Sequence, residues 1–237
     1  MTKRVAIVQS NYVPWKGYFD LIAQVDEFVL YDDAQYTRRD WRNRNRVKTQ
    51  AGAQWLTIPV EQKGRYHQPI REVEVADPGW TERHWRTIEH AYGRAAAFAE
   101  YGPRLGEVYR AAAADRTLSA VNRRFLEACC GWLGIDTRLR WSSEFELAEG
   151  RTERLVDICR QAGATEYWSG PAARDYLDEA AFARHGIAVR WMDYHGYPEH
   201  PQLFPPFEHH VSIVDLLLNT GADARRFLRR DAGATDR

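Results

Sequence analysis

The stretch Arg4-Val5-Ala6-Ile7-Val8-Gln9 and the stretch from Asp26 to Asp33, which contains Phe28-Val29-Leu30-Tyr31, are short apolar runs. Between them, the polar and aromatic loop 10–15 leads to Gly17, which opens a segment with apolar residues at helical spacing. Runs of this length predict buried strands, and the segment between them predicts a short helix. These four segments, a strand, a loop, a helix and a second strand, span about thirty residues. This is the length of a βαβ unit with parallel strands. The sequence therefore predicts an α/β fold.

The rest of the chain continues this alternation. Residues 41–50 and 54–60 flank Ala51-Gly52-Ala53 and predict a hairpin, and a helical block covers about 80–134. Further strands are predicted at 70–75, 137–141, 166–169 and 187–192. Further helix signals are Thr81 to Tyr92, Pro103 in a first turn, Leu118 to Gly134, Thr152 as a cap, Asp175 to His185, and Ser212 to Gly221. We expect one α/β unit over residues 1–230, with a parallel or mixed sheet and flanking helices, and a disordered tail at 231–237.

Composition limits the classes of function. The 33 Lys and Arg balance the 33 Asp and Glu, which argues against a mainly electrostatic nucleic-acid binder. Three cysteines without a framework spacing favour reduced thiols in the cytoplasm. No apolar run reaches the length of about 18 residues that a membrane span needs, and the N-terminus leads into a strand rather than a signal peptide. We expect a cytoplasmic protein that acts on a small molecule, with a homodimer among the states to consider.

The loop after the first strand is the first candidate site. It carries Gln9, Tyr12, Lys16 and Tyr18, leaves the carboxyl end of a strand, and leads into a helix N-terminus, which favours anions. Nine Trp and twelve Tyr fit sites that stack rings or bind sugars, but they also fit an aromatic core. Packing of the loop aromatics on the sheet is the structural alternative.

Paired carboxylates end the second strand. Asp32 and Asp33, with Gln35 beyond them, can bind an amine, accept a proton or hold Mg²⁺. The alternative is that one of them caps a turn. We favour Asp33 as a general base, because it follows an apolar strand and neighbours a second carboxylate.

A basic stretch runs from Trp41 to Lys48. If it is a strand, its alternation places four cations, Arg42, Arg44, Arg46 and Lys48, on one face. Such a row suits phosphate, although a solvated edge strand uses charge in the same way. Asn43 and Asn45 fall on the other face, and asparagine is a poor strand former, which favours a binding role for them.

Histidines and later polar residues complete the candidates. His84 and Tyr92 lie roughly on one side of a predicted helix, where His84 is either a catalytic donor or a structural residue. Ser169 precedes a Gly-Pro turn and, with Tyr176, is expected to bind substrate. Gln202 lies in a segment that contains His195, His200, His209 and His210, whose spacing matches no zinc signature, so no metal is expected.

The chain carries a set of spaced motifs: Gly17-Tyr18-Phe19, Tyr31-Asp32-Asp33-x-Gln35-Tyr36, Trp41-x-Asn43-Arg44-Asn45, Trp80…His84…Tyr92, Tyr167-x-Ser169-Gly170, Tyr197…Gln202 and Ser212-Ile213-x-Asp215-Leu216-Leu217. Together these motifs resemble those of the WbqC-like family. The resemblance covers about residues 4–225 and departs at Ser10-Asn11 and Ala34. The opening unit is also loosely similar to the nucleotidyltransferase-like fold, but it lacks that fold's histidine motif.

The resemblance implies biosynthesis of surface polysaccharides, amino sugars or natural products. The expected activity is transfer of an acyl or aminoacyl group to an amine of a sugar-like acceptor, from an acyl-thioester or nucleotide donor. Asn43, Arg44 and Asn45 would hold the donor or its diphosphate. Two alternatives stay open at this stage: an ATP-dependent adenylate-forming ligase, and a non-catalytic binding or scaffold protein in a biosynthetic complex.

Overall fold

A five-stranded parallel sheet forms the centre of the computed structural model, which describes residues 2–228. Its strands stand in the order β5-β2-β1-β6-β7, and every neighbouring pair is parallel. The predicted α/β class and the opening βαβ unit are therefore confirmed. The strands are β1 (Arg4–Val8), β2 (Glu27–Leu30), β5 (Arg138–Trp141), β6 (Glu166–Ser169) and β7 (Ala188–Trp191).

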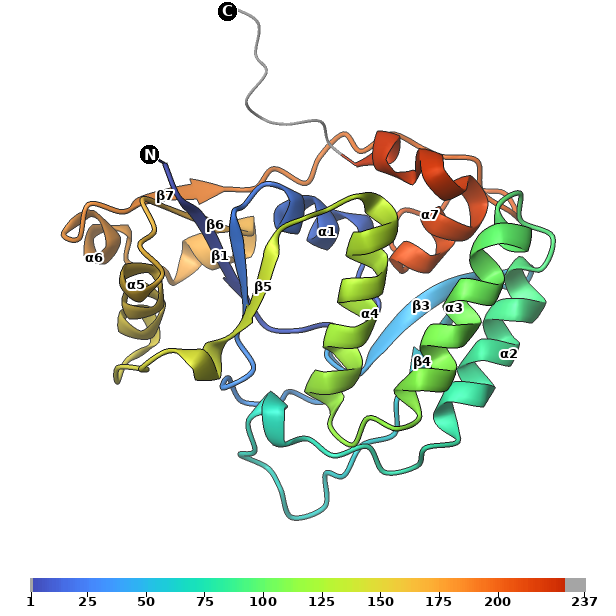
Figure 1. The fold of residues 1–237 in the computed structure, drawn as a ribbon, viewed down its shortest axis with the longest axis horizontal. Coiled ribbons are helices and arrows are strands. Elements are labelled where there is room, and N and C mark those ends of the chain that lie inside the picture. The colour runs from blue at the N-terminus through green and yellow to red at the C-terminus, as the bar shows by residue number, and fades with distance from the viewer. Residues whose placement is uncertain (1, 229–237) are drawn as a thin grey trace, which may run out of the picture.

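Helices cover both faces of the sheet, which is why its central strands are apolar on both sides. On one face lie α1 (Lys16–Ala23) and α4 (Leu118–Leu133), packed on Ala6 and Phe28. On the other lie α5 (Arg151–Gln161) and α6 (Glu179–Ala183), packed on Val5 and Val29 (Figure 1).

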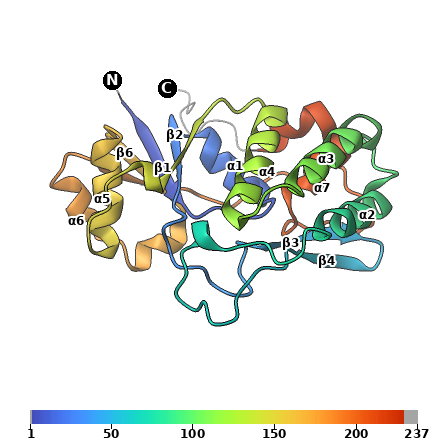
Figure 2. The ribbon, with the colours of Figure 1, turned by 60° about the horizontal axis from the view of Figure 1, so that its bottom comes forward.

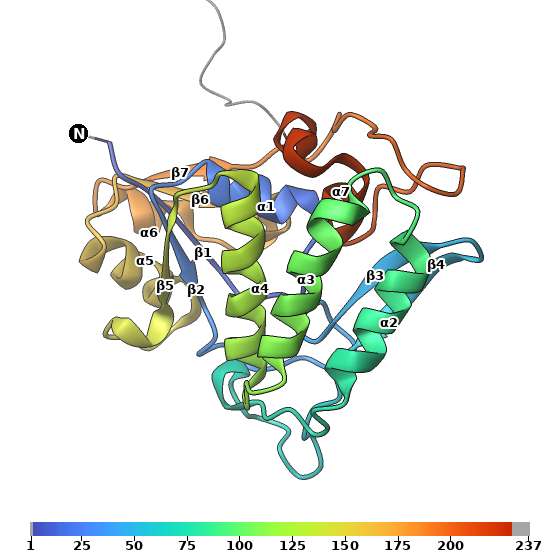
Figure 3. The same cartoon turned by 45° about the vertical axis from the view of Figure 1, so that its right-hand side comes forward.

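A second layer stands beside this sheet. The hairpin of β3 (Arg44–Thr49) and β4 (Gly52–Thr57) lies against α2 (Trp80–Tyr92), as Figure 2 shows. The helices α2, α3 (Phe98–Ala112) and α4 stand side by side, and α7 (Ile213–Thr220) contacts α3 (Figure 3). An apolar cluster that includes Tyr12, Trp80 and Phe125 joins the hairpin and helices to the loop after β1.

The strand order reverses between β1 and β6. Counted along the chain, the sheet reads third, second, first, fourth, fifth, which is the order of a doubly wound fold. In such sheets ligands bind beyond the carboxyl ends of the strands at this reversal. The fold therefore directs attention to the residues that follow β1 and β6.

The predicted strand at 70–75 was wrong. Ile70–Glu72 is a 3-10 helix, and Ile70 and Val73 are both buried in the core, three residues apart. The sequence Val73-Glu74-Val75 imitates the alternation of a strand, but this segment forms only isolated bridges, at Glu74 and Val75. The other 3-10 helices are Ser142–Glu144, Pro171–Asp175 and Gly221–Phe227.

Three helix signals were also misplaced. Pro103 lies inside α3, which begins five residues earlier, where the Ala97 N–H bonds to the Leu218 carbonyl of α7. Gly150, and not Thr152, is the N-cap of α5. The helix predicted from Asp175 to His185 shortens to Glu179–Ala183, because Asp178 caps it with its carboxylate.

Two other expectations concern the C-terminal tail and membrane-spanning helices. The tail predicted to be disordered at 231–237 lies outside the described residues. Across residues 2–228, no helix is both long enough and apolar enough to cross a membrane.

Candidate functional site

A cleft of about 800 Å³ opens at the point where the strand order reverses. Val8 and Gln9 at the end of β1 form one side of it, and Ser169 and Gly170 at the end of β6 form another. Ala34 and Gln35, beyond β2, and the first turn of α5 complete the lining. We call this hollow the switch-point cleft.

Four residues that the sequence predicted as substrate-binding meet in the switch-point cleft: Gln9, Gln35, Ser169 and Tyr176. They come from four separate stretches of chain that the parallel sheet brings to one edge. The Tyr18 hydroxyl donates to the Gln9 carbonyl at 2.9 Å, which fixes the backbone where β1 ends. Tyr18 is itself buried, and burial raises its pKa well above the usual value.

Arginines give the cleft its charge. Arg42, Arg151 and Arg154 line it, and no Asp, Glu or His is among the described residues that do so. Within residues 2–228, neither Arg151 nor Arg154 forms an ion pair, whereas Arg42 pairs with Asp40 at 3.7 Å and its buried Nε has no hydrogen-bond partner. Positive charge that is not neutralised by neighbours favours an anionic ligand.

The sequence prediction did not assign Arg151 and Arg154 to the site. Their spacing of three residues at the start of a helix is a readable sign that they share a face. The carboxylate of Glu153 turns back over Gly150, whose added Cβ would lie 2.2 Å from Glu153 Oε2. The charge of the cleft therefore comes from the arginine side chains rather than from the N–H groups of the α5 N-terminus.

His84 and Tyr12 lie in the core instead. His84 Nε2 is 3.2 Å from the Thr57 carbonyl, which can only accept, so this nitrogen carries the proton. Nδ1 then accepts from the Tyr12 hydroxyl at 2.9 Å, and Tyr12 accepts from Tyr109 at 2.6 Å. Burial is the main cause that lowers the pKa of His84 from 6.5 to about 4. A neutral histidine with both nitrogens occupied favours a structural role, so its predicted catalytic role rests on the sequence alone.

Asp32 and Asp33 line a smaller hollow of about 190 Å³ beside the cleft. Asp32 is buried and accepts bonds from the Ser10 N–H and hydroxyl and from the Ser119 hydroxyl. Burial, opposed by these bonds, raises the pKa of Asp32. Asp33 Oδ1 pairs with Arg71 Nε at 2.6 Å, and its Oδ2 accepts from Ser142 at 2.6 Å. Asp33 is thus the partly open carboxylate of the pair, immediately before Ala34 of the cleft.

The predicted row of four cations is divided in the structure. Arg42 precedes β3 and turns to the cleft, while the Arg44 guanidinium stacks over the exposed Trp55 ring at 4.2 Å. Lys48 is buried, and its ammonium donates to Gln202 Oε1 and to the Pro206 carbonyl.

The two asparagines fix backbone. Asn43 Nδ2 donates to the Ile58 carbonyl at 2.8 Å, and Asn45 Nδ2 donates to the carbonyls of Tyr12 and Val13 at 3.1 and 3.0 Å. Trp41 is half exposed and, with Asn45, lines a separate pocket of about 240 Å³.

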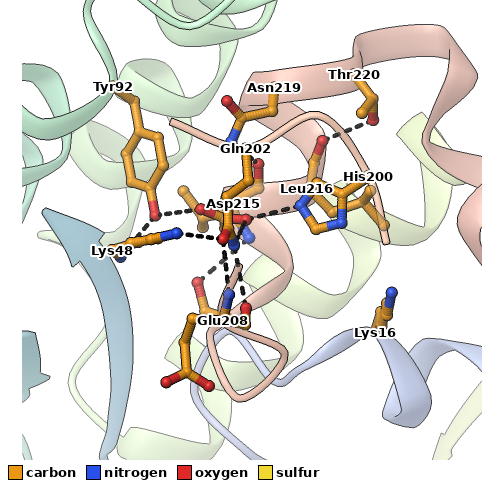
Figure 4. Close-up of polar contacts among 12 residues, drawn as sticks. Lys16, Lys48, Tyr92, His200, Gln202, Glu208, Asp215, Leu216, Asn219 and Thr220 are labelled. Carbon is orange, nitrogen blue, oxygen red and sulfur yellow. Dashed lines mark hydrogen bonds and ion pairs between the residues drawn. The ribbon is translucent and has the colours of Figure 1, made fainter. Parts of the chain in front are cut away.

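Tyr92 and Gln202 meet around a residue that was not predicted, the fully buried Asp215 (Figure 4). Asp215 accepts from the Tyr92 hydroxyl at 3.0 Å, from Gln202 Nε2 at 2.7 Å and from His200 Nε2 at 2.8 Å. These contacts attach the irregular segment between β7 and α7 to the helices beneath it. The capping pattern Ser212-x-x-Asp215 was the available signal, but it indicates only where a helix begins.

Lys16 lies to one side of the same network in Figure 4, where no dashed line reaches it. Its ammonium donates to the Pro198 carbonyl at 2.8 Å. Burial lowers the pKa of Lys16 from 10.5 to about 8, against the opposing effect of Asp215 and Glu199. Nowhere in the described part of the chain do three His, Cys, Asp or Glu side chains gather in a way that could hold a metal ion.

Comparison with known proteins agrees with the motifs. The model of the WbqC-like protein family matches residues 9–227. The chain belongs to the WbqC-like protein family. It is 56% identical over 227 residues to "Uncharacterized protein Rv1507c" of Mycobacterium tuberculosis, a match that covers 96% of this chain and 98% of the relative. No solved structure matches it. The switch-point cleft of this WbqC-like chain lies almost wholly within the matched residues.

Proposed function

We propose that this protein is a transferase that binds a nucleotide-linked or other phosphate-bearing donor in the switch-point cleft. It moves an acyl or aminoacyl group from that donor to an amine of a sugar-like acceptor. The observation that carries the proposal is the group of Arg42, Arg151 and Arg154 at the reversal of the sheet, without a lining carboxylate. Guanidinium groups bind phosphate through paired, charge-assisted hydrogen bonds.

The polar residues of the cleft suit the rest of such a donor. Gln9 and Ser169 stand at the ends of β1 and β6, and the amide and hydroxyl can bind the hydroxyls of a ribose or of an attached group. Tyr176 offers a half-exposed ring at the outer edge. A volume of about 800 Å³ accommodates a ligand of nucleotide size.

The transfer step needs a base, and no Asp, Glu or His is among the described residues that line the cleft, so we look for the base beside it. The acceptor nitrogen forms a bond to the acyl carbon, the bond from that carbon to the donor oxygen or sulfur breaks, and the nitrogen loses a proton. Asp33 is the proposed base because it immediately precedes Ala34 of the cleft and opens on the adjoining hollow. Its ion pair with Arg71 must open for this role.

The test is a single-turnover assay by mass spectrometry. Glucosamine is offered with an acyl thioester or with an aminoacyl nucleotide, and the N-acylated sugar is measured. Asp33→Asn is expected to lower the rate by about a hundredfold or more, which begins at the lower end of the usual effect of a general base. Asp157→Asn, a change on α5 away from both hollows, serves as the matched control.

The outcomes separate this proposal from its rivals. Release of pyrophosphate from ATP that depends on the acceptor would replace it with an adenylate-forming ligase. Binding of nucleotide with no turnover of any donor would leave a binding protein. An Asp33→Asn enzyme with full activity would remove Asp33 from the reaction.

A further inference from the structure

A second pocket, of about 240 Å³, lies next to the switch-point cleft but is not part of it. Two indole rings form much of its wall, so we call it the tryptophan pocket. Its lining residues are Asn11, Pro14, Trp15, Trp41, Asn45 and His210.

The tryptophan pocket and the cleft share a wall. Gln9 and Arg42 line the cleft, whereas Asn11 and Trp41, close to them in the chain, line the pocket. The Arg42 guanidinium donates to Asn11 Oδ1 across this wall. A molecule in the pocket therefore lies beside the cation that faces the cleft.

The pocket is held in a fixed shape. Asn45 binds the carbonyls of Tyr12 and Val13, and the Ile213 N–H donates to the Pro14 carbonyl at 2.9 Å. Val13 has a φ of 36°, which is strained for a β-branched residue. These bonds keep the loop after β1 in a conformation that is unfavourable without them.

The position of Trp15 depends on Gly17. A Cβ at Gly17 would lie 2.3 Å from Trp15 Cζ2, so the indole occupies the space that a side chain would fill. The same ring packs edge-on against Tyr194 and Tyr197 at 5.3 and 5.6 Å between centroids. This wall is thus preformed, as ligand pockets usually are.

The chemistry of the wall differs from that of the cleft. No Asp, Glu, Lys or Arg is among the described residues that line it, and His210 is its one titratable side chain. Two indoles offer faces on which the C–H face of a sugar ring packs, and each has an N–H to bind hydroxyls. Asn11 adds an amide whose oxygen is taken by Arg42 and whose nitrogen makes no bond within the described chain.

We propose that the tryptophan pocket binds the pyranose ring of the acceptor, beside a donor held in the cleft. This inference rests on the proposed function, because it places the second substrate of the same reaction. A sugar ring fits these walls better than a phosphate, because no Arg or Lys among the described lining residues would pair with the phosphate charge.

The experiment uses calorimetric titration of the full chain with two separate probes, methyl β-D-glucosaminide and UDP. Trp41→Ala is expected to weaken glucosaminide binding by about tenfold or more, a difference that calorimetry resolves readily, and Trp41→Phe should recover most of it. Tyr66→Ala is the control, since Tyr66 is also an exposed aromatic residue and lies outside the pocket, whereas Trp55 packs on Trp41 at 5.4 Å between ring centroids. UDP binding should survive Trp41→Ala and be weakened by Arg151→Glu, which should leave glucosaminide binding unchanged.

Several results would overturn the inference. These are no saturable binding of the glucosaminide to the unaltered chain, equal binding by Trp41→Ala, or displacement of the sugar by adenosine, which would make the pocket a nucleobase site. Failure of UDP to bind while the glucosaminide still requires Trp41 would instead refute the proposed function and leave the sugar pocket in place.

Discussion

The guanidinium carbon of Arg151 lies 3.8 Å from the centroid of the Tyr176 ring. This contact joins the first turn of α5 to the segment that follows β6, across the outer edge of the switch-point cleft. The ring holds the cation in place but does not neutralise its charge, whereas a carboxylate partner would.

Tyr176→Ala should therefore weaken UDP binding. An exposed cation–π contact is worth about 0.5–1 kcal/mol, which corresponds to a loss of affinity of about two- to fivefold. Tyr66→Ala is a matched control, because Tyr66 stacks with Arg38 at 5.2 Å and lies outside the cleft. Calorimetric titration measures the difference, and equal losses in both variants would argue against a role for Tyr176.

Gly17→Ala should disturb the tryptophan pocket and spare the cleft. The new Cβ would meet the Trp15 ring at 2.3 Å, so the indole must move away from the pocket wall. We expect glucosaminide affinity to fall by at least about tenfold, with UDP affinity kept. Gly131→Ala on α4, where a Cβ meets nothing within 4 Å, should change neither. Unaltered sugar binding in Gly17→Ala would mean that Trp15 does not contact the ligand.

His84 should make stability depend on pH in the acid range. Its pKa is about 4 in the folded chain against 6.5 when unfolded, so the unfolded state binds the proton first as pH falls. The stability contribution is complete above pH 6.5 and is lost progressively down to about pH 4. This gap corresponds to about 3 kcal/mol.

Urea denaturation at pH 7 and pH 4.5 measures this effect. His84→Gln should lose less stability between the two pH values than the unaltered chain loses. His90→Gln, on the exposed side of the same helix, should retain the full pH dependence. A pH dependence that is identical in all three proteins would contradict the buried neutral histidine.

Asp215→Asn should lower the free energy of unfolding. The amide removes an acceptor that His200 and Gln202 share and places a donor against donors. A buried polar group left without its partner costs about 1–3 kcal/mol. The midpoint of urea denaturation should fall accordingly, whereas Asp223→Asn, an exposed change, should have little effect. A stable Asp215→Asn protein would show that the network does not hold the segment before α7.

The strands of the sheet could be predicted from the sequence because the signals that indicate them are local. Apolar runs at residues 5–8 and 28–30 lie on strands that are buried on both faces, so composition alone identifies them. The strand order could not be deduced, because it depends on how the hairpin and α2 to α4 are inserted between β2 and β5. The strand predicted at 70–75 was wrong because burial there does not follow the alternation of the sequence. Ile70 and Val73 are buried three residues apart, which is a helical spacing.

The candidate site was predictable in its polar part and not in its charged part. Gln9 and Ser169 stand immediately after strands, where parallel sheets bind ligands, so their position carried the information. Arg151 and Arg154 sit on a helix whose place beside β1 is fixed only by the tertiary fold. Tyr12 and Asn45 are polar groups that bond to the protein itself, and the sequence cannot distinguish such groups from ligand contacts.

In the proposed function, the arginines of the switch-point cleft bind the phosphate of the donor. The most direct measurement is the affinity of the full chain for UDP and ADP, compared with that of the double variant Arg151→Glu, Arg154→Glu. Loss of charge-assisted bonds worth about 1.5–3 kcal/mol predicts a fall of about tenfold or more, with an unchanged melting temperature. Arg104→Glu with Arg110→Glu on α3 and, separately, Arg44→Ala should leave the affinity unchanged. Equal nucleotide affinity in the Arg151, Arg154 variant, or no binding by the unaltered chain, would contradict the account.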